Sequence, residues 1–164
     1  MKSAAQLRIE AAAATAVGAL VHVLPRRVVL ALGAALGRVW AALDRRHVAI
    51  AVDNLTLAFP DWTDARRRGT AHAVYAHFGR VLLDLLWMSG RGKEDILALV
   101  DMEGLENADR AHEAGRGTVF VCAHFGGWEI HGLTYPWLTG RNIGMIVRAL
   151  DNPALDQASS PCAP

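Results

Sequence analysis

Cysteine is scarce in this sequence, and so are long uncharged stretches and any excess of one charge. Its two cysteines, Cys122 and Cys162, form neither a CxxC pair nor a metal-ligand spacing, which argues against a disulfide scaffold or a zinc finger. The formal net charge is +1, so no overall attraction to nucleic acid is expected. We therefore predict no metal, no other cofactor and no nucleic-acid partner.

No apolar stretch reaches the roughly 20 residues that a membrane crossing needs, although 52% of the residues are hydrophobic and the mean hydropathy is +0.20. Residues 11–24 are uncharged, but Pro25 and two arginines follow them. Pro25 would end one helix and begin the next. Residues 4–43 are therefore predicted to form two membrane-associated helices hinged at Pro25.

One face of each predicted helix is apolar. The faces contain Val17, Leu20, Val21 and Leu24 in the first helix, and Val29, Leu32, Leu36, Val39 and Leu43 in the second. This pattern fits a helical hairpin packed on a core and equally an anchor lying in the membrane interface, with a spanning helix as a third alternative.

A long helix is predicted over residues 65–88, where apolar residues recur at steps of three and four. Thr63 or Asp64 would cap its start. His72 and His77 lie on this helix and are expected to be structural or solvated. Arginines cluster at residues 26–27, 45–46 and 66–68, which indicates solvated helix ends or contacts with anionic lipid head groups.

The second half of the chain predicts an α/β fold. Helices are expected over residues 93–99 and 105–114, with a short strand at 100–104 between them. The β-branched and apolar run 118–123 predicts a buried strand. A helix over 129–138 and a strand over 143–147 would complete a βαβ unit. We therefore expect the helical hairpin and the long helix to pack on a partial mixed or parallel sheet.

His124 and Glu129 stand where the predicted strand meets a helix, separated by two glycines. Gly126 and Gly127 can bend the chain so that the carboxylate reaches the imidazole and fixes its tautomer. The other ring nitrogen is then a general base for a hydroxyl group. The alternative is structural, with His124 as a helix cap and Glu129 favouring the helix dipole. A metal site that adds Cys122 and His131 matches no zinc pattern.

These residues resemble a known family. His-Phe-Gly-Gly-Trp-Glu at 124–129 is similar to the HxxxxD/E motif of the bacterial lipid A biosynthesis (lauroyl/myristoyl) acyltransferases, in the glycerophosphate-acyltransferase-like superfamily. Gly127 replaces the usual Asn of that motif. Three flanking blocks agree in order: Asn-Leu-Thr-Leu-Ala-Phe-Pro at 54–60, Gly-Arg-Gly at 115–117, and Arg-Ala-Leu-Asp-Asn-Pro at 148–153.

The resemblance implies an enzyme at the cytoplasmic face of the bacterial inner membrane. It would move a fatty acyl chain from an acyl carrier protein or acyl-CoA thioester to a hydroxyl of a lipid acceptor. His124 would deprotonate that hydroxyl and Glu129 would orient His124. Arg148 and Asn152 would contact a phosphate of the acceptor or of the donor's phosphopantetheine, and Gly126 and Gly127 would line the substrate site.

The sequence also departs from the family, whose members are about twice as long. Residues 1–156 are predicted to be the N-terminal part of a single acyltransferase domain, with 157–164 as an irregular tail. A C-terminally truncated, catalytically inactive fragment or a membrane-surface binding remnant is therefore the alternative to an active acyltransferase. A soluble metal-dependent hydrolase is a third hypothesis.

Overall fold

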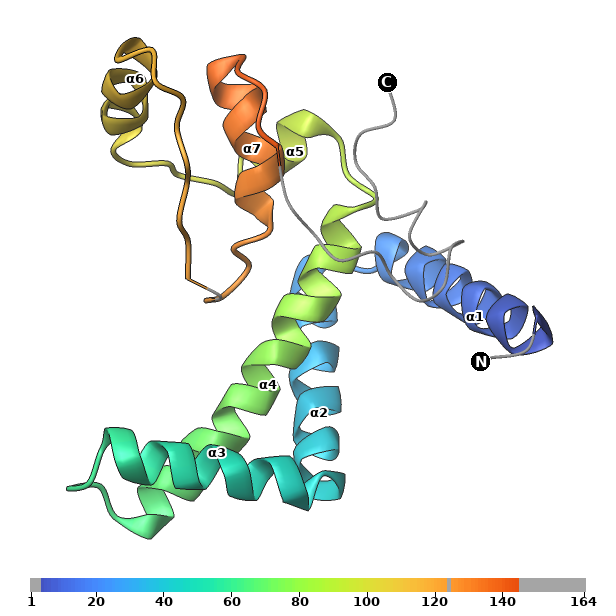
Figure 1. Ribbon diagram of the computed structural model, residues 1–164. Coiled ribbons are helices and arrows are strands. Elements are labelled where there is room, and N and C mark those ends of the chain that lie inside the picture. Colours follow the sequence, from blue (N-terminus) through green and yellow to red (C-terminus); the bar gives the residue numbers. More distant parts are fainter. Residues whose placement is uncertain (1–3, 124, 145–164) are drawn as a thin grey trace. The chain divides into compact units, whose positions relative to one another are not determined.

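Residues 4–123 and 125–144 are described in the computed structural model of the chain, and their regular structure is helical throughout (Figure 1). The chain divides into two compact units, Met1–Gly90 and Arg91–Pro164. Each unit has its own helices and its own packing. The single domain predicted over residues 1–156 stays a prediction.

Four helices build the first unit, α1 (Ala4–Val23), α2 (Arg26–Leu43), α3 (Arg45–Ala58) and α4 (Asp64–Met88). The break at Pro25 confirms the predicted hinge, but the predicted hairpin is wrong, because α1 and α2 each pack on α4 rather than on each other. Thr63 caps α4 by accepting a hydrogen bond from the Arg66 N–H at 3.3 Å, which confirms the long helix and its cap. Helix α3 was not predicted from the sequence; Asp44 caps it by accepting a hydrogen bond from the His47 N–H at 3.3 Å.

Glycines let α2 and α4 meet backbone to backbone. A Cβ on Gly37 would lie 2.8 Å from the Cα of Ala76, and the Tyr75 carbonyl would be nearer still. A Cβ on Gly33 would lie 2.9 Å from the Cα of Arg80. Gly79 meets Gly33 from the other helix in the same way. Since no side chain fits between the two backbones, the glycines fix the crossing of these helices.

Small residues also form the main buried cluster of this unit, in which Ala41, Val48 and Ala71 join α2, α3 and α4. The predicted apolar face of α2 is not the face that packs. Val29 is buried, but Leu32, Leu36, Val39 and Leu43 are 45% to 77% exposed. Within the described residues, no helix combines the length and the apolar composition that would let it cross a membrane.

The described part of the second unit contains three shorter helices, α5 (Lys93–Leu97), α6 (Leu105–Glu113) and α7 (Ile130–Thr139). Their positions confirm the three helices predicted there. Helix α5 contacts α7, and Ile96, Thr134 and Tyr135 are the buried residues of these two helices.

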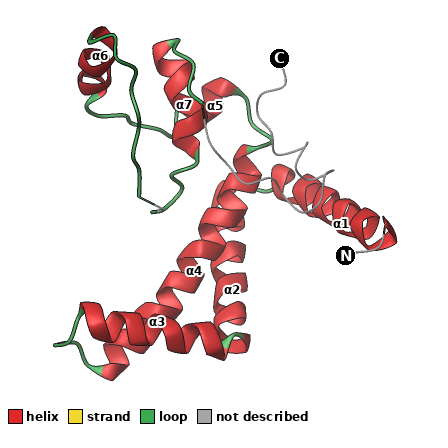
Figure 2. Cartoon of the chain, in the orientation of Figure 1, coloured by secondary structure: helices red, strands yellow, loops and turns green. Residues whose placement is uncertain are grey.

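The predicted α/β class and its βαβ unit are wrong for the described part of the chain, which contains helices and loops (Figure 2). Residues 100–104 and 118–123 form no strand, and of the expected strand at 143–147 only 143–144 are described. A strand exists only when a neighbouring strand accepts and donates its ladder hydrogen bonds. Residues 118–123 have no such neighbour among the described residues, and Val119 and Val121 are 88% and 93% exposed instead of buried.

Candidate active site

The described part of the predicted site is the turn that leads into α7. Gly126, Gly127 and Glu129 belong to it, whereas His124, Arg148 and Asn152 lie outside the described residues. The structure therefore places one member of the predicted catalytic pair. It brings that member together with the two glycines but leaves the other predicted contacts untested.

Short-range hydrogen bonds define the shape of this turn. The Phe125 N–H donates to the Ala123 carbonyl at 2.8 Å, and the Ile130 N–H donates to the Gly127 carbonyl at 3.1 Å. Gly126 has a φ of +61°, in the left-handed region that glycine adopts without strain. Among the described residues, a Cβ on either Gly126 or Gly127 would meet no atom within 4 Å. Gly126 is therefore required by its backbone angle, and the space beside both glycines is open.

Glu129 holds the residue position just before α7 and makes no capping hydrogen bond with its side chain. Its Oε2 atom is buried and has no hydrogen-bond partner among the described residues. A buried carboxylate oxygen without a donor is costly, so native structures nearly always supply one. The environment of Glu129 is therefore suited to an N–H or O–H donor that approaches this oxygen.

The extended segment before the turn is open to solvent. Val119, Val121 and Phe125 are 83% to 93% exposed, and the Cys122 thiol is also exposed. Phe120 packs edge-on against Tyr135 of α7, with the ring centroids 4.9 Å apart. This aromatic contact attaches the segment to the helix that begins at the site.

A polar contact supports the other end of α7. The Arg141 guanidinium, just after α7, pairs with Asp109 of α6. The hydrogen bond from Arg141 to Asp109 raises the pKa of the Arg141 guanidinium above its ordinary value. Helix α7, which follows the turn that carries Glu129, therefore contacts α5, Phe120 and, through Arg141, also α6.

Metal-binding side chains do not cluster in the part of the chain that the structure describes. There, no three His, Cys, Asp or Glu side chains come together as a candidate metal site. Cys122 is exposed, and Glu129 has the buried oxygen described above. The chemistry that the described residues offer is that of a carboxylate positioned next to an open, glycine-lined turn.

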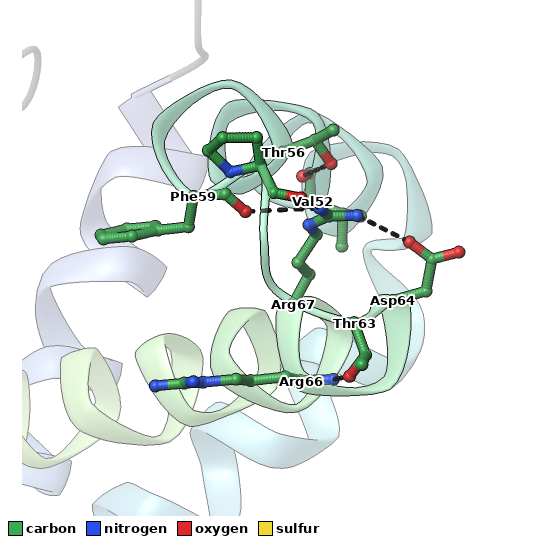
Figure 3. A network of polar contacts seen from close by, with 8 residues as sticks. Val52, Thr56, Phe59, Thr63, Asp64, Arg66 and Arg67 are labelled. Atoms are coloured by element: carbon green, nitrogen blue, oxygen red, sulfur yellow. Dashed lines mark hydrogen bonds and ion pairs between the residues drawn. The ribbon is translucent and has the colours of Figure 1, made fainter.

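The block at residues 54–60 forms the end of α3 and the turn before α4, and Arg67 holds it together (Figure 3). The Arg67 guanidinium donates to the Phe59 carbonyl at 3.3 Å, to the Pro60 carbonyl at 2.6 Å and to Asp64 at 2.9 Å. Arg67 stands between Arg66 and Arg68 in a cluster interpreted from the sequence as a solvated helix end or a lipid contact, so this role was not predicted. The residue is in fact buried.

Residues 3–160 match the family model described as bacterial lipid A biosynthesis acyltransferase. The chain belongs to this family. The match covers nearly the whole sequence, including both the Arg67 turn and the turn at Glu129. It confirms the family that the four sequence blocks resemble.

Individual relatives agree with this assignment. The chain is 30% identical over 97 residues to the lipid A biosynthesis myristoyltransferase of Escherichia coli K12. That match covers 59% of this chain and 29% of the relative. It is 29% identical over 113 residues to the E. coli lipid A biosynthesis palmitoleoyltransferase and to a Shigella flexneri lipid A biosynthesis acyltransferase. Each of those two matches covers 66% of this chain and 36% of the relative. The chain thus spans about a third of the length of these relatives, and no solved structure matches it.

Proposed function

We propose that this chain carries the catalytic residues of an O-acyltransferase. The enzyme transfers a fatty acyl chain from a thioester, carried by acyl carrier protein or coenzyme A, to a hydroxyl of a lipid acceptor of the lipid A precursor type. Membership of the lipid A acyltransferase family supports the reaction class. The observation that carries the assignment of residues is the buried Oε2 of Glu129, which lies five residues after His124 and has no hydrogen-bond partner among the described residues.

In the proposed mechanism His124 is the general base and Glu129 is its positioning partner. The Glu129 carboxylate accepts a hydrogen bond from one ring N–H of His124, which leaves the other nitrogen free to take the proton of the acceptor hydroxyl. The hydroxyl oxygen then attacks the thioester carbonyl carbon. Collapse of the tetrahedral intermediate breaks the carbon–sulfur bond, and the proton returns from His124 to the departing thiolate.

The glycine turn has a role in the same proposal. The amides of Gly126 and Gly127 lie in the turn that precedes α7, and backbone N–H groups in such a position can stabilise a developing negative charge. The absence of side chains at these glycines leaves room for the thioester carbonyl beside them. Arg148 and Asn152 are proposed to contact a phosphate of the acceptor or the donor.

We also propose that the protein works at the cytoplasmic face of the bacterial inner membrane. The support is the set of large apolar side chains that the first unit leaves exposed, among them Leu32, Leu36, Phe78 and Leu82, each 45% to 68% exposed. Covering such a surface with lipid acyl chains removes apolar area from water, which is favourable.

The direct test measures acyl transfer from acyl carrier protein and coenzyme A thioesters to a lipid A precursor. The assay uses the 164-residue chain and the same chain extended to the length of its relatives. His124→Ala should reduce transfer to background, and Glu129→Gln should lower kcat by roughly 10²–10⁴-fold, the usual contribution of a positioned acid or base. Glu106→Gln, an exposed change on α6, is the matched control and should keep full activity.

The outcomes separate the alternatives. Wild-type activity in His124→Ala would rule out this mechanism. Transfer by the extended chain alone would make the 164-residue chain an inactive fragment of an acyltransferase. Absence of transfer in both chains, with either thioester, would contradict the proposed function itself.

A further inference from the structure

A groove of about 480 Å³ lies on one flank of the α2–α4 pair in the first unit. Its lining comes from one residue of α2 and five of α4, namely Arg38, Gly69, His72, Ala73, Ala76 and Arg80. None of these residues belongs to the proposed acyltransferase site or to the arginine clusters that the sequence singled out. The groove is therefore a separate feature of the molecule.

Small residues give the groove its depth. Gly69, Ala73 and Ala76 recur at steps of four and three along α4, so they share one face of the helix. A Cβ on Gly69 would meet nothing within 4 Å. Because these positions carry at most a methyl group, space remains between the longer side chains of His72, Arg38 and Arg80.

The crossing of α2 and α4 fixes the backbone positions of the two arginines that line this space. Arg38 directly follows Gly37, which meets Ala76 of α4, and the Cα of Arg80 lies against Gly33 of α2. The backbones at these points touch with no side chain between them. The two guanidinium groups therefore project from a rigid part of the unit rather than from a loop.

The positive charge of the groove is not neutralised within the described residues. Arg26, Arg67 and Arg141 each pair with an aspartate, whereas Arg38 and Arg80 take part in no ion pair or hydrogen bond there. Asp84 comes one turn after Arg80, but Arg26 occupies both of its oxygens at 2.8 and 2.6 Å. That pairing raises the pKa of Arg26 and leaves the groove cationic.

The arginines of the groove lie on other helix faces than the exposed Leu36 and Phe78. Arg38 is two residues after Leu36, and Arg80 is two residues after Phe78. Two residues correspond to about 200° of helix rotation, so each arginine lies nearly opposite its apolar neighbour. On both helices, therefore, the arginine of the groove and its exposed apolar neighbour occupy nearly opposite faces.

We propose that the groove formed by Arg38, His72 and Arg80 binds a phosphate group. Guanidinium groups match the oxygens of phosphate with paired, charge-assisted hydrogen bonds, and the imidazole adds one more donor. The chemistry fits a phosphate monoester or diester, either on a molecule in solution or on a lipid head group. This proposal does not depend on acyl transfer, because none of its residues belongs to the catalytic pair.

The test titrates inorganic phosphate into the full chain at constant ionic strength, with binding measured by calorimetry. The double variant Arg38→Gln/Arg80→Gln should bind phosphate at least about tenfold more weakly, the factor that 1.4 kcal/mol produces. The matched control is Lys93→Gln/Arg110→Gln, which removes two exposed charges from α5 and α6 and should bind as the wild type does. All four side chains are exposed, and none of them lies in the buried cluster of the first unit.

A second arm identifies the source of the phosphate. Vesicles of phosphatidylglycerol and of phosphatidylcholine are compared by co-flotation with the wild type and both variants. If only the groove variant loses its preference for phosphatidylglycerol, the groove binds a lipid head group; if it keeps that preference but loses phosphate binding, the ligand is a soluble phosphate compound. Equal loss of phosphate binding in both variants, or no saturable binding by the wild type, would overturn the proposal.

Discussion

Arg67 shows how much one side chain can contribute to this molecule. It is 8% exposed and holds the carbonyls of Phe59 and Pro60 in the turn between α3 and α4. Arg67→Met would leave both carbonyls without this donor. A hydrogen bond that involves a charged group contributes about 1.5–3 kcal/mol to stability. We therefore expect the free energy of unfolding to fall by about 2–3 kcal/mol, measured by urea denaturation.

The neighbouring arginine supplies the control for this prediction. Arg68 is exposed, so Arg68→Met should change the free energy of unfolding by less than about 0.5 kcal/mol. Arg67→Lys keeps the charge but not the planar fork, and should recover only part of the loss. Equal effects of the methionine changes at the two positions would contradict the role assigned to Arg67.

The sequence could predict single residues only where their partners are near in the chain. Thr63 as the cap of α4 needed only the residues beside it, and it is confirmed. The spacing of His124 and Glu129 indicated a catalytic pair, but no pattern showed that Oε2 of Glu129 is buried and lacks a partner in the described part of the chain. Arg67 looked like its exposed neighbours because the Phe59 and Pro60 carbonyls lie eight and seven residues before it, in a turn whose shape no sequence pattern specified.

At the scale of the helices, the α2–α4 crossing depends on glycine. Gly37→Ala would place a methyl group 2.8 Å from the Cα of Ala76, and backbone atoms cannot rotate away as a side chain can. We expect this change to lower the free energy of unfolding by about 1–3 kcal/mol, as overpacking does. Thermal unfolding followed by circular dichroism measures the effect.

Gly69 is the matched control on α4. It also lies inside a helix, but a Cβ there would meet nothing within 4 Å. Gly69→Ala should therefore stabilise the protein by about 0.5–1 kcal/mol through helix propensity alone. If Gly37→Ala were stabilising to the same degree, the backbone contact between α2 and α4 would be absent in solution.

Helices and strands differed in how well the sequence predicted them. The helices that begin after Pro25 and at Asp64 follow local signals, so their positions were confirmed. The apolar run 118–123 has the composition of a strand, but a strand also needs a neighbour that its own residues do not specify. Composition alone therefore predicted a sheet that the described structure lacks. Residues 118–123 do not specify which other segment would pair with them as a neighbouring strand.

At the scale of the whole molecule, surface features arise from helices that are distant in the sequence. Arg38 and Arg80 are 42 residues apart in the sequence. They line the same groove only because α2 and α4 cross. His72 was expected to be structural or solvated, and the crossing makes it part of the same groove. The family, by contrast, was evident from short motifs, since each motif is contiguous in the chain.

The two units should also differ in how well they protect their backbone amides. In the first unit, the helical hydrogen bonds of α2 and α4 are shielded where the backbones touch around Gly37 and Gly79. In the second unit, the exposed residues 118–123 form no strand. Hydrogen exchange measured by mass spectrometry should show slow exchange at the centres of α2 and α4, and exchange near the unfolded-chain rate over 118–123.

Strong protection of 118–123 in the isolated chain would mean that this segment is hydrogen-bonded after all. The absence of a strand partner could then no longer explain why the predicted sheet is missing.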